Sequence, residues 1–159
     1  MINLHYGKAE KTDAVLLIDI YNSAFYDDYV RYGECPAYGR TVEQMENSID
    51  NFPKEIVFCD NTPVGVISVE EKGDGIYYLG CLCVVPEYQG KGIGTQAFRH
   101  LLTVYPDWKK FVLVTPADKE ENIRFYTEKC GFKIEGTSMD GSVKVVSFIK
   151  ERRYLNMGV

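Results

Sequence analysis

The residues from Gln89 to Gly94, which read Gln-Gly-Lys-Gly-Ile-Gly, have the composition of a loop that binds an anion. Glycines lack a Cβ, so the main chain can approach a ligand closely and can take positive φ angles. An apolar run ends at Val85 and helix propensity begins at Gly92, which places the loop between a strand and a helix. The free N–H groups of a first helical turn attract anions together with the helix dipole. We therefore predict a site for a pyrophosphate, which uses several convergent N–H donors.

The spacing of the glycines separates this loop from two common nucleotide-binding motifs. Gly90, Gly92 and Gly94 make G-x-G-x-G, whereas the Rossmann pattern is G-x-G-x-x-G. A P-loop needs Lys followed by Ser or Thr, but Lys91 is followed by Gly92. Glycines alone are also typical of a plain turn between a strand and a helix, so other parts of the sequence must decide between these readings.

A second group of residues that could bind a ligand lies between Tyr26 and Gly39, which we predict to be irregular. Tyrosines and carboxylates alternate there: Tyr26, Tyr29, Tyr32 and Tyr38 with Asp27, Asp28 and Glu34. Aromatic faces and carboxylates suit a cationic ammonium group. The segment is therefore a candidate site for an amine, such as a polyamine, an amino acid, an aminoglycoside or a protein N-terminus. Packing of the loop on itself is the alternative.

The sequence does not predict a metal site. Cys81 and Cys83 make a C-x-C in an apolar strand, and the only histidines are His5 and His100. These residues lack the spacing of structural zinc ligands. We expect both cysteines to be buried thiols.

The elements that position these residues follow from two hydrophobic periods. We expect strands over residues 2–6, 56–59, 64–70, 76–85, 111–115, 132–137 and 143–150, and helices that begin near Asp13, after Thr41, at Gly92 and at Glu120. Thr41 and Gln44 make a capping box, and Gly131 ends the last helix. The order β-α-α-β-β-β-α-β-α-β-β predicts an α/β (α+β) fold, with a mixed, mostly antiparallel sheet of six to seven strands and helices on both faces.

Length and composition narrow the class of protein. The chain has 159 residues, which fits a single domain over residues 1–159, and 45% of them are hydrophobic. The net charge of −5 leaves no basic excess for a nucleic acid or an anionic membrane. The N-terminus has no signal-peptide pattern, and no apolar run is long enough to span a membrane. We therefore expect a cytoplasmic protein with five free thiols.

From Leu79 to Phe132 the sequence resembles the GCN5-related N-acetyltransferase (GNAT) family. The central motif of that family is Q/R-x-x-G-x-G/A between a strand and a helix, and Gln89, Gly92 and Gly94 match it. Residues 82–88, Leu-Cys-Val-Val-Pro-Glu-Tyr, are similar to the L-x-V-x-P-E-Y approach of the family. In the order of elements the resemblance extends from Ile2 to about Glu151.

The resemblance implies that acetyl-CoA is the co-substrate and that no metal is required. Main-chain groups of Leu82, Cys83 and Val84, at a bulge in the strand, are expected to hold the pantetheine arm and to face the thioester carbonyl. Gln89 completes the motif. The amides of Gly90, Lys91, Gly92, Ile93, Gly94 and Thr95 are expected to hold the pyrophosphate. The strands at 76–85 and 111–115 are expected to splay apart in a V.

A second motif supports the resemblance. The stretch from Asn122 to Phe132 is similar to the N…F-Y-x-K-x-G-F string of family members, in which the tyrosine protonates the leaving thiolate. The resemblance gives that catalytic role to Tyr126, and a phenol with an ordinary pKa of about 10 is protonated at neutral pH. Asn122 is four residues before Tyr126, whereas many relatives have the asparagine seven residues before, where this chain has Lys119. Asn122 is the candidate cofactor contact, and a core position is the alternative for Tyr126.

The expected reaction is direct attack of a primary amine, on a small molecule or a peptide, on the acetyl thioester. The residues that bind or deprotonate the amine are poorly specified by the sequence; the candidates are Tyr26, Tyr29, Glu34, Glu70 and Tyr78, with Asp27 and Asp28 as further carboxylates. A relay of bulk water is an equal alternative. By strand alternation Tyr78 projects to the same side as Leu82.

Four points remain open. Cys83 is a weak candidate for a covalent nucleophile, because no basic residue flanks it in the sequence. A catalytically silent module that binds acetyl-CoA as a sensor or scaffold would keep the same loop but would not need Tyr126. The acyl group could also be longer than acetyl, and a homodimer is left open as the assembly.

Overall fold

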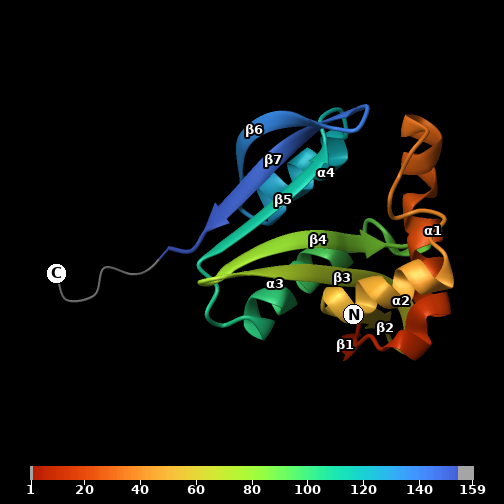
Figure 1. Cartoon of the computed structure of the whole chain (residues 1–159). Coiled ribbons are helices and arrows are strands. Elements are labelled where there is room, and N and C mark those ends of the chain that lie inside the picture. Colours follow the sequence, from red (N-terminus) through yellow and green to blue (C-terminus); the bar gives the residue numbers. More distant parts are fainter. Residues whose placement is uncertain (1, 154–159) are drawn as a thin grey trace. The chain divides into compact units, whose positions relative to one another are not determined.

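The computed structural model of the protein describes residues 2–153 (Figure 1). The chain forms two compact units, which are described separately below. Of the described residues, the first unit contains 2–70 and 79–101, and the second contains 71–78 and 102–153. The single domain expected over residues 1–159 stays a prediction, and its ends, residue 1 and residues 154–159, lie outside the described residues. Seven strands follow the order β1-β2-β3-β4-β5-β7-β6, which confirms the mixed sheet.

Three strands of the first unit pair antiparallel, as the apolar runs predict. β1 (Leu4–Lys8) pairs with β2 (Lys54–Cys59), and β2 pairs with β3 (Thr62–Gly73). The last strand, β4 (Ile76–Val84), follows a two-residue turn at Asp74-Gly75, where both φ angles are positive. All six residues from 64 to 69 in β3 are buried. Both faces of β3 are therefore covered, as expected for helices on both sides of a sheet.

Two helices cover one face of the first unit. α1 (Ala14–Tyr32) and α2 (Val42–Asn51) bury apolar side chains against Ile56 of β2, Val66 of β3 and Cys83 of β4. The capping box at the start of α2 is confirmed: Gln44 N donates to Thr41 Oγ1 over 3.1 Å, and Thr41 N donates to Gln44 Oε1 over 2.9 Å. Because these bonds satisfy free N–H groups of the first turn, they fix where α2 begins.

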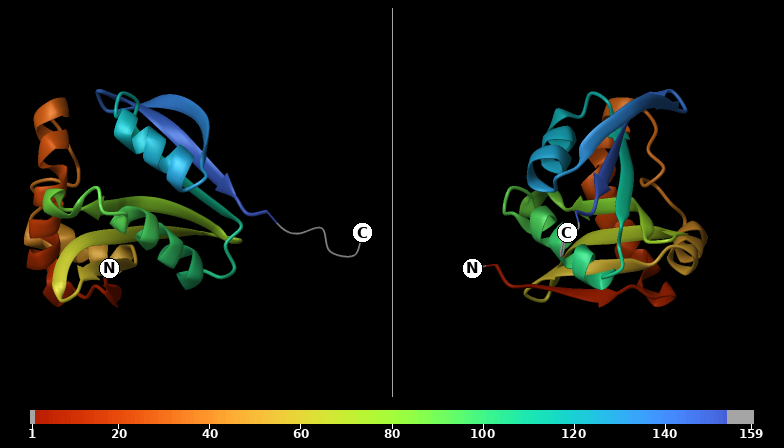
Figure 2. Two further views of the ribbon diagram at one scale, coloured as in Figure 1. Left: turned by 180° about the vertical axis from the view of Figure 1, so that it is seen from behind. Right: turned by 90° about the vertical axis from the view of Figure 1, so that its left-hand side faces the viewer.

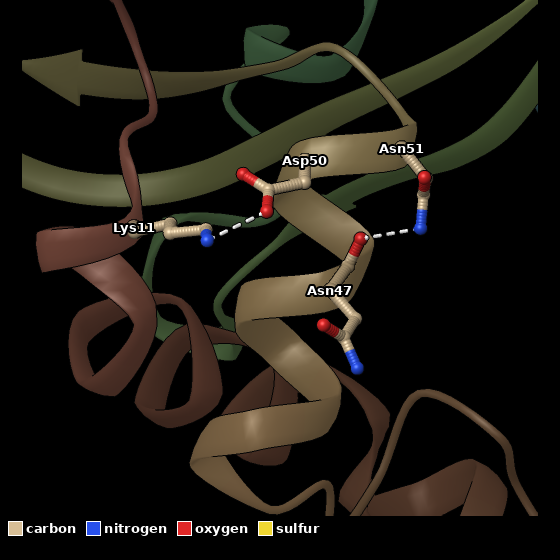
Figure 3. A network of polar contacts seen from close by, with 4 residues as sticks. All are labelled: Lys11, Asn47, Asp50 and Asn51. Carbon is tan, nitrogen blue, oxygen red and sulfur yellow. Dashed lines mark hydrogen bonds and ion pairs between the residues drawn. The ribbon is translucent and has the colours of Figure 1, made fainter.

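Side chains at the far end of α2 join it to the short 3-10 helix Lys11–Asp13 that precedes α1. Lys11 Nζ lies 2.8 Å from Asp50 Oδ2 in an exposed ion pair (Figure 3). The side-chain amide of Asn51 donates to the Asn47 carbonyl over 2.9 Å within the last turn of α2. These exposed contacts orient the helix end, and exposed ion pairs of this kind add little to stability.

The structure corrects the segment that we predicted to be irregular. α1 continues through Tyr26, Asp27, Asp28 and Tyr29 to Tyr32, and the irregular part begins only at Gly33. Gly33 has a φ of 75° and its N–H donates to the Tyr29 carbonyl, which is a left-handed glycine cap. The mixture of tyrosines and aspartates concealed this helix, because these residues have modest helix propensities.

The helix α3 (Ile93–Val104) covers the opposite face of the first unit. His100 Nε2 lies 2.5 Å from Glu55 Oε2, and the His100 ring stacks on Tyr6 at 3.7 Å between centroids. Glu55 precedes Ile56, whose side chain faces α1 and α2, so alternation along β2 places Glu55 on the other face. The short 3-10 helix Pro86–Tyr88 connects β4 to the glycine-rich loop before α3.

The second unit contains the remaining strands. β5 (Lys110–Pro116) pairs antiparallel with β7 (Val143–Glu151), and β7 pairs with β6 (Lys133–Asp140), beside α4 (Glu120–Arg124) (Figure 2). β5 also pairs parallel with β4, where Tyr77 is opposite Phe111. The V-shaped splay expected between these strands stays a prediction. The last hairpin turns at Gly141-Ser142, because β6 extends to Asp140 and not only to residue 137 as we predicted.

The last helix also differs from its prediction over residues 120–130. Its α-helical part ends at Arg124, and residues Phe125–Lys129 form a π turn in which Cys130 N donates to the Phe125 carbonyl over 3.2 Å. Gly131, at φ 78°, follows it and ends the helix as expected. Among residues 2–153 no helix is both long and apolar enough to cross a membrane.

Candidate active site

The loop predicted to bind pyrophosphate is anchored to the end of β4 by its first residue. The Gln89 side-chain amide donates to the Val84 carbonyl over 2.9 Å. One residue further on, Val85 N donates to the Val64 carbonyl over 2.8 Å, which joins this end of β4 to β3. Gln89 therefore has a local structural role, because its side-chain hydrogen bond fixes the start of the loop to the end of β4.

Two of the three glycines have the backbone conformation expected of them. Gly90 has a φ of 76° and Gly92 a φ of 80°, and an added Cβ would have no heavy atom within 4 Å at either position. A side chain there would thus be opposed by backbone strain and not by a steric clash. The expectation of positive φ is wrong for Gly94, which lies within α3.

The first turn of α3 presents the N–H groups that the sequence predicts. Gln96 N donates to the Gly92 carbonyl over 3.1 Å, which is the first hydrogen bond of the helix. The amides of Ile93, Gly94 and Thr95 precede this bond and have no carbonyl partner within an α-helix. Lys91 is exposed beside them. This turn can accept an anion by its geometry, and its contact with a pyrophosphate stays a prediction.

The β4 segment expected to hold the pantetheine arm is packed closely against β3. Leu82 and Val84 are half-buried and Cys83 is buried. A Cβ on Gly65 of β3 would lie 2.3 Å from the Cys83 carbonyl oxygen, so the two main chains approach at this point. The bulge expected in β4 at these residues stays a prediction.

The structure identifies polar neighbours of the β4 cysteines that the sequence could not reveal. Hydrogen bonding with Cys81, together with burial, holds the pKa of the Cys83 thiol well above its usual range. A covalent role for Cys83 is therefore not favoured. The pKa of Cys81 is lowered, first by the hydrogen bond with Cys83 and then, against burial, by a hydrogen bond with Tyr21 and by the charges of Lys54 and Arg40.

The predicted general acid, Tyr126, lies in the second unit. Its side chain is 7% exposed and forms ring contacts with Phe125, Phe132 and Phe148, with centroids 5.0, 5.7 and 5.9 Å away. The aromatic packing that we weighed as the alternative is therefore present, and it fixes the orientation of the ring. Tyr126 is part of the π turn, a feature frequent at functional sites. Asn122 is half-buried on α4.

Three tyrosines of the N-terminal segment form an aromatic cluster in the first unit. The rings of Tyr29 and Tyr38 stack at 4.5 Å, and Tyr26 lies 6.1 Å from Tyr38. Tyr26 and Tyr29 are 53% and 44% exposed on the last two turns of α1. Glu34 is exposed in the loop that follows α1. This surface has the aromatic and acidic character that the sequence predicted, although a helix presents most of it.

The two remaining candidates lie on the strands β3 and β4. Glu70 is half-buried and does not end its strand, as we had expected, because β3 continues to Gly73. Tyr78, in the second unit, has Lys72 Nζ 5.9 Å from its ring centroid. Among the described residues 2–153, no three His, Cys, Asp or Glu side chains are grouped so as to hold a metal ion.

Comparison with known proteins places this arrangement in a family. Residues 17–132 match the model of the acetyltransferase (GNAT) family. In sequence, 56 residues are 45% identical to the uncharacterized protein YrkN of Bacillus subtilis strain 168; the match covers 35% of this chain and only 30% of that protein.

Two solved structures share the fold over nearly the whole chain. One is the PaiA N-acetyltransferase of Thermoplasma acidophilum in complex with coenzyme A, with a TM-score of 0.78 and 21% identity over 94% of this chain and 99% of that one. The other is the ribosomal-protein-S18-alanine N-acetyltransferase of Escherichia coli, with a TM-score of 0.76 and 15% identity over 99% of both chains. The chain therefore belongs to the acetyltransferase (GNAT) family.

Proposed function

We propose that this enzyme transfers the acetyl group of acetyl-CoA to a primary amine of a small molecule or peptide, by direct attack of the neutral amine on the thioester. The observation that carries this proposal is the loop after β4. Gln89 fixes its start, Gly90 and Gly92 have positive φ angles, and α3 begins directly after it. A pyrophosphate next to the first turn of α3 would satisfy N–H groups that the helix leaves unpaired.

The proposed cofactor site continues from this loop along β4. The amides from Gly90 to Thr95 bind the pyrophosphate, and main-chain groups of Leu82, Cys83 and Val84 bind the pantetheine arm. Because main-chain groups make these contacts, the side chains of β4 are free to be apolar. The coenzyme A complex of the PaiA N-acetyltransferase, which has this fold, supports the choice of ligand. In this proposal Asn122 is a further contact to the cofactor.

Tyr126 is the proposed general acid, which donates its phenolic proton to the sulfur of coenzyme A as the C–S bond breaks. A phenol suits this step, because an ordinary pKa of about 10 keeps it protonated at neutral pH. The close packing of the Tyr126 ring on Phe132 and Phe148 supports the role, because a fixed ring holds its hydroxyl in one position.

The proposed acceptor surface is the tyrosine cluster of Tyr26, Tyr29 and Tyr38, with Glu34 nearby in sequence. Glu70 and Tyr78 are the other candidate contacts. The exposed rings of Tyr26 and Tyr29 would attract the ammonium form of the acceptor. The ammonium group would then lose its proton to one of the carboxylates or to water. The S18-alanine N-acetyltransferase acts on a ribosomal protein, which makes a peptide acceptor one candidate. A cytoplasmic location and a homodimer stay predictions.

Release of free coenzyme A thiol, measured with a panel of primary amines and peptides, tests the reaction. The wild type is expected to release thiol with at least one acceptor. Tyr126→Phe is expected to bind coenzyme A normally, but its turnover is expected to be at least about 100-fold slower. Phenylalanine keeps the ring that packs in the core, so this variant separates chemistry from folding. Binding of acetyl-CoA without turnover on every amine would instead identify the silent sensor or scaffold module.

Steady-state kinetics of a helix α1 variant tests the acceptor surface. Tyr29→Ala is expected to raise the KM for the amine several-fold and to leave the KM for acetyl-CoA unchanged, because one face of the aromatic cluster is lost. Val30→Ala is the matched control, since Val30 is 62% exposed on the same helix turn. Equal amine KM values for the two variants would show that the acceptor binds elsewhere. Assays with longer acyl-CoA donors test the choice of acetyl.

A further inference from the structure

A row of polar side chains crosses three strands of the first unit beneath α1 and α2. Lys54 of β2 is opposite Ser68 of β3 in the strand register. β3 ends at Gly73 and β4 begins at Ile76, on either side of the two-residue turn. Ser68 and Cys81 are the sixth residues from that turn on the two antiparallel strands, which places them opposite each other. Lys54, Ser68 and Cys81 are therefore successive cross-strand neighbours on one face.

Two positive charges adjoin this row. Lys54 is only 4% exposed, and its Nζ donates to Ser68 Oγ over 2.7 Å. Arg40 is half-buried, with its guanidinium 5.3 Å from the centroid of the buried Tyr21 ring. Within the described part of the chain, neither cation forms an ion pair with a carboxylate. A buried cation without an anion is costly, so an anionic group between the two would stabilise this region.

The Cys81 thiol is placed to supply that anion. It is half-buried, packs against the core under α1 and α2, and shares hydrogen bonds with Cys83 and Tyr21. The bond with Cys83 contributes most to lowering the pKa of Cys81, and the bond with Tyr21 and the two cations add to it, against burial. Cys83 and Tyr21, whose own pKa values are raised, remain the proton donors.

We propose that Cys81 is an oxidant-sensitive thiol, beside the cations Lys54 and Arg40, that hydrogen peroxide converts to a sulfenic acid through its thiolate form. The thiolate sulfur attacks one peroxide oxygen, the O–O bond breaks, and the departing hydroxide takes a proton from water or a neighbouring donor to leave as water. Sulfur is oxidised by two electrons and peroxide is reduced by two. Partly exposed thiols beside positive charges are the cysteines that react in this way.

The consequence for activity rests on the proposed function. Cys81 directly precedes Leu82, Cys83 and Val84, the segment proposed to hold the pantetheine arm. A sulfenic oxygen adds a polar group to a closely packed position, so oxidation is expected to displace β4 and to slow acetyl transfer. The structure thus assigns to Cys81 a control point that responds to peroxide, whereas Cys83 and Cys130 are buried and protected.

Competitive labelling of the whole protein tests the inference. Limiting iodoacetamide at pH 7, or peroxide followed by dimedone, would be quantified at each cysteine by peptide mass spectrometry. Cys81 is expected to react at least about fivefold faster than Cys59, because an ordinary thiol is only a few per cent thiolate at this pH. Cys59 is the matched control, since it is also half-buried on a strand of the first unit.

Two variants identify the cause of the reactivity. Lys54→Met and Arg40→Gln are expected to slow labelling of Cys81 and to leave Cys59 unchanged. Equal rates for Cys81 and Cys59 in the wild type, which need no variant, would overturn the inference, as would unchanged Cys81 rates in both variants. Peroxide is expected to slow acetyl transfer by the wild type but not by Cys81→Ser. If the wild type acetylated no amine, the proposed function would fail, and the labelling rates would still decide the state of Cys81.

Discussion

The main chains of Gly65 and Cys83 touch where β3 passes β4. A Cβ on Gly65 would lie 2.3 Å from the Cys83 carbonyl oxygen and 3.4 Å from the carbonyl carbon. Main-chain atoms in paired strands cannot move aside as the end of a flexible side chain can. Glycine at position 65 therefore allows Cys83 and the residues beside it to lie this close to β3.

Gly65→Ala is expected to destabilise the protein by at least about 2 kcal/mol, because the methyl group must push β3 away from β4. Urea unfolding measures this loss, and calorimetry with coenzyme A is expected to show weaker binding in the same variant. Gly136→Ala is the control: this glycine lies on β6 with no heavy atom within 4 Å of an added Cβ. The control should change stability by no more than about 0.5 kcal/mol. A Gly65→Ala protein as stable as the control would contradict the close approach.

Substitution in the glycine-rich loop should separate backbone strain from ligand binding. Gly92 and Gly39 have φ angles of 80° and 75°, and neither has a heavy atom within 4 Å of an added Cβ. Alanine at either position is expected to cost about 1–2 kcal/mol of stability, because it disfavours the left-handed conformation. Only Gly92→Ala is expected to weaken coenzyme A binding as well, by about fivefold or more. Titration calorimetry of both variants measures the difference, and equal affinities would count against the pyrophosphate site.

The features that the sequence predicted are those set by neighbouring residues. Thr41 and Gln44, which make the capping box, are three residues apart. The loop from Gln89 to Gly94 is recognised from its composition and from the strand and helix on either side of it. The seven strands and their order in the chain also follow from local hydrophobic period. Signals of this kind depend only on residues close together in the chain, so they can be identified without knowing the fold.

The features that the sequence missed depend on long-range pairing or on weak local preference. The pairing of three strands brings together Lys54, Ser68 and Cys81. No residue close to Cys81 in the sequence indicates that a cation lies beside it. The end of α1 at Tyr32 was missed for another reason. Tyrosines and aspartates favour a helix only weakly, and the decisive signal was Gly33 beyond them, which caps the helix in a left-handed conformation.

The capping box of α2 gives a prediction about stability alone. Thr41→Ala is expected to lower the free energy of unfolding by about 1 kcal/mol, since Gln44 N loses the hydroxyl that accepts its hydrogen bond. Thr41→Ser keeps that oxygen and is expected to remain close to the wild type. Thermal and urea unfolding of the two variants provide the measurement. If serine were as destabilising as alanine, packing of the threonine methyl group, and not the cap, would be the cause.

The buried amine of Lys54 gives the last prediction, a dependence of stability on pH. Burial, aided by the charge of Arg40 and opposed by Cys81, lowers the pKa of Lys54 from 10.5 to about 8. Between these two values the unfolded chain binds more protons at this site than the folded chain. The contribution of Lys54 to the free energy of unfolding therefore rises as the pH increases from about 8 to 10.5.

Comparison with Lys54→Met removes the contributions of the titrating groups that do not interact with Lys54. The free energy of unfolding of the wild type minus that of Lys54→Met is expected to increase by roughly 2–3 kcal/mol between pH 7.5 and pH 10.5, given about 1.4 kcal/mol for each unit of pKa. Urea titrations at several pH values under reducing conditions measure the difference. Lys8→Met, at an exposed strand lysine, should give a flat difference. A flat or falling difference for Lys54→Met would mean that the amine is hydrated and keeps its charge in the folded protein, in which case it could not be a buried cation beside Cys81.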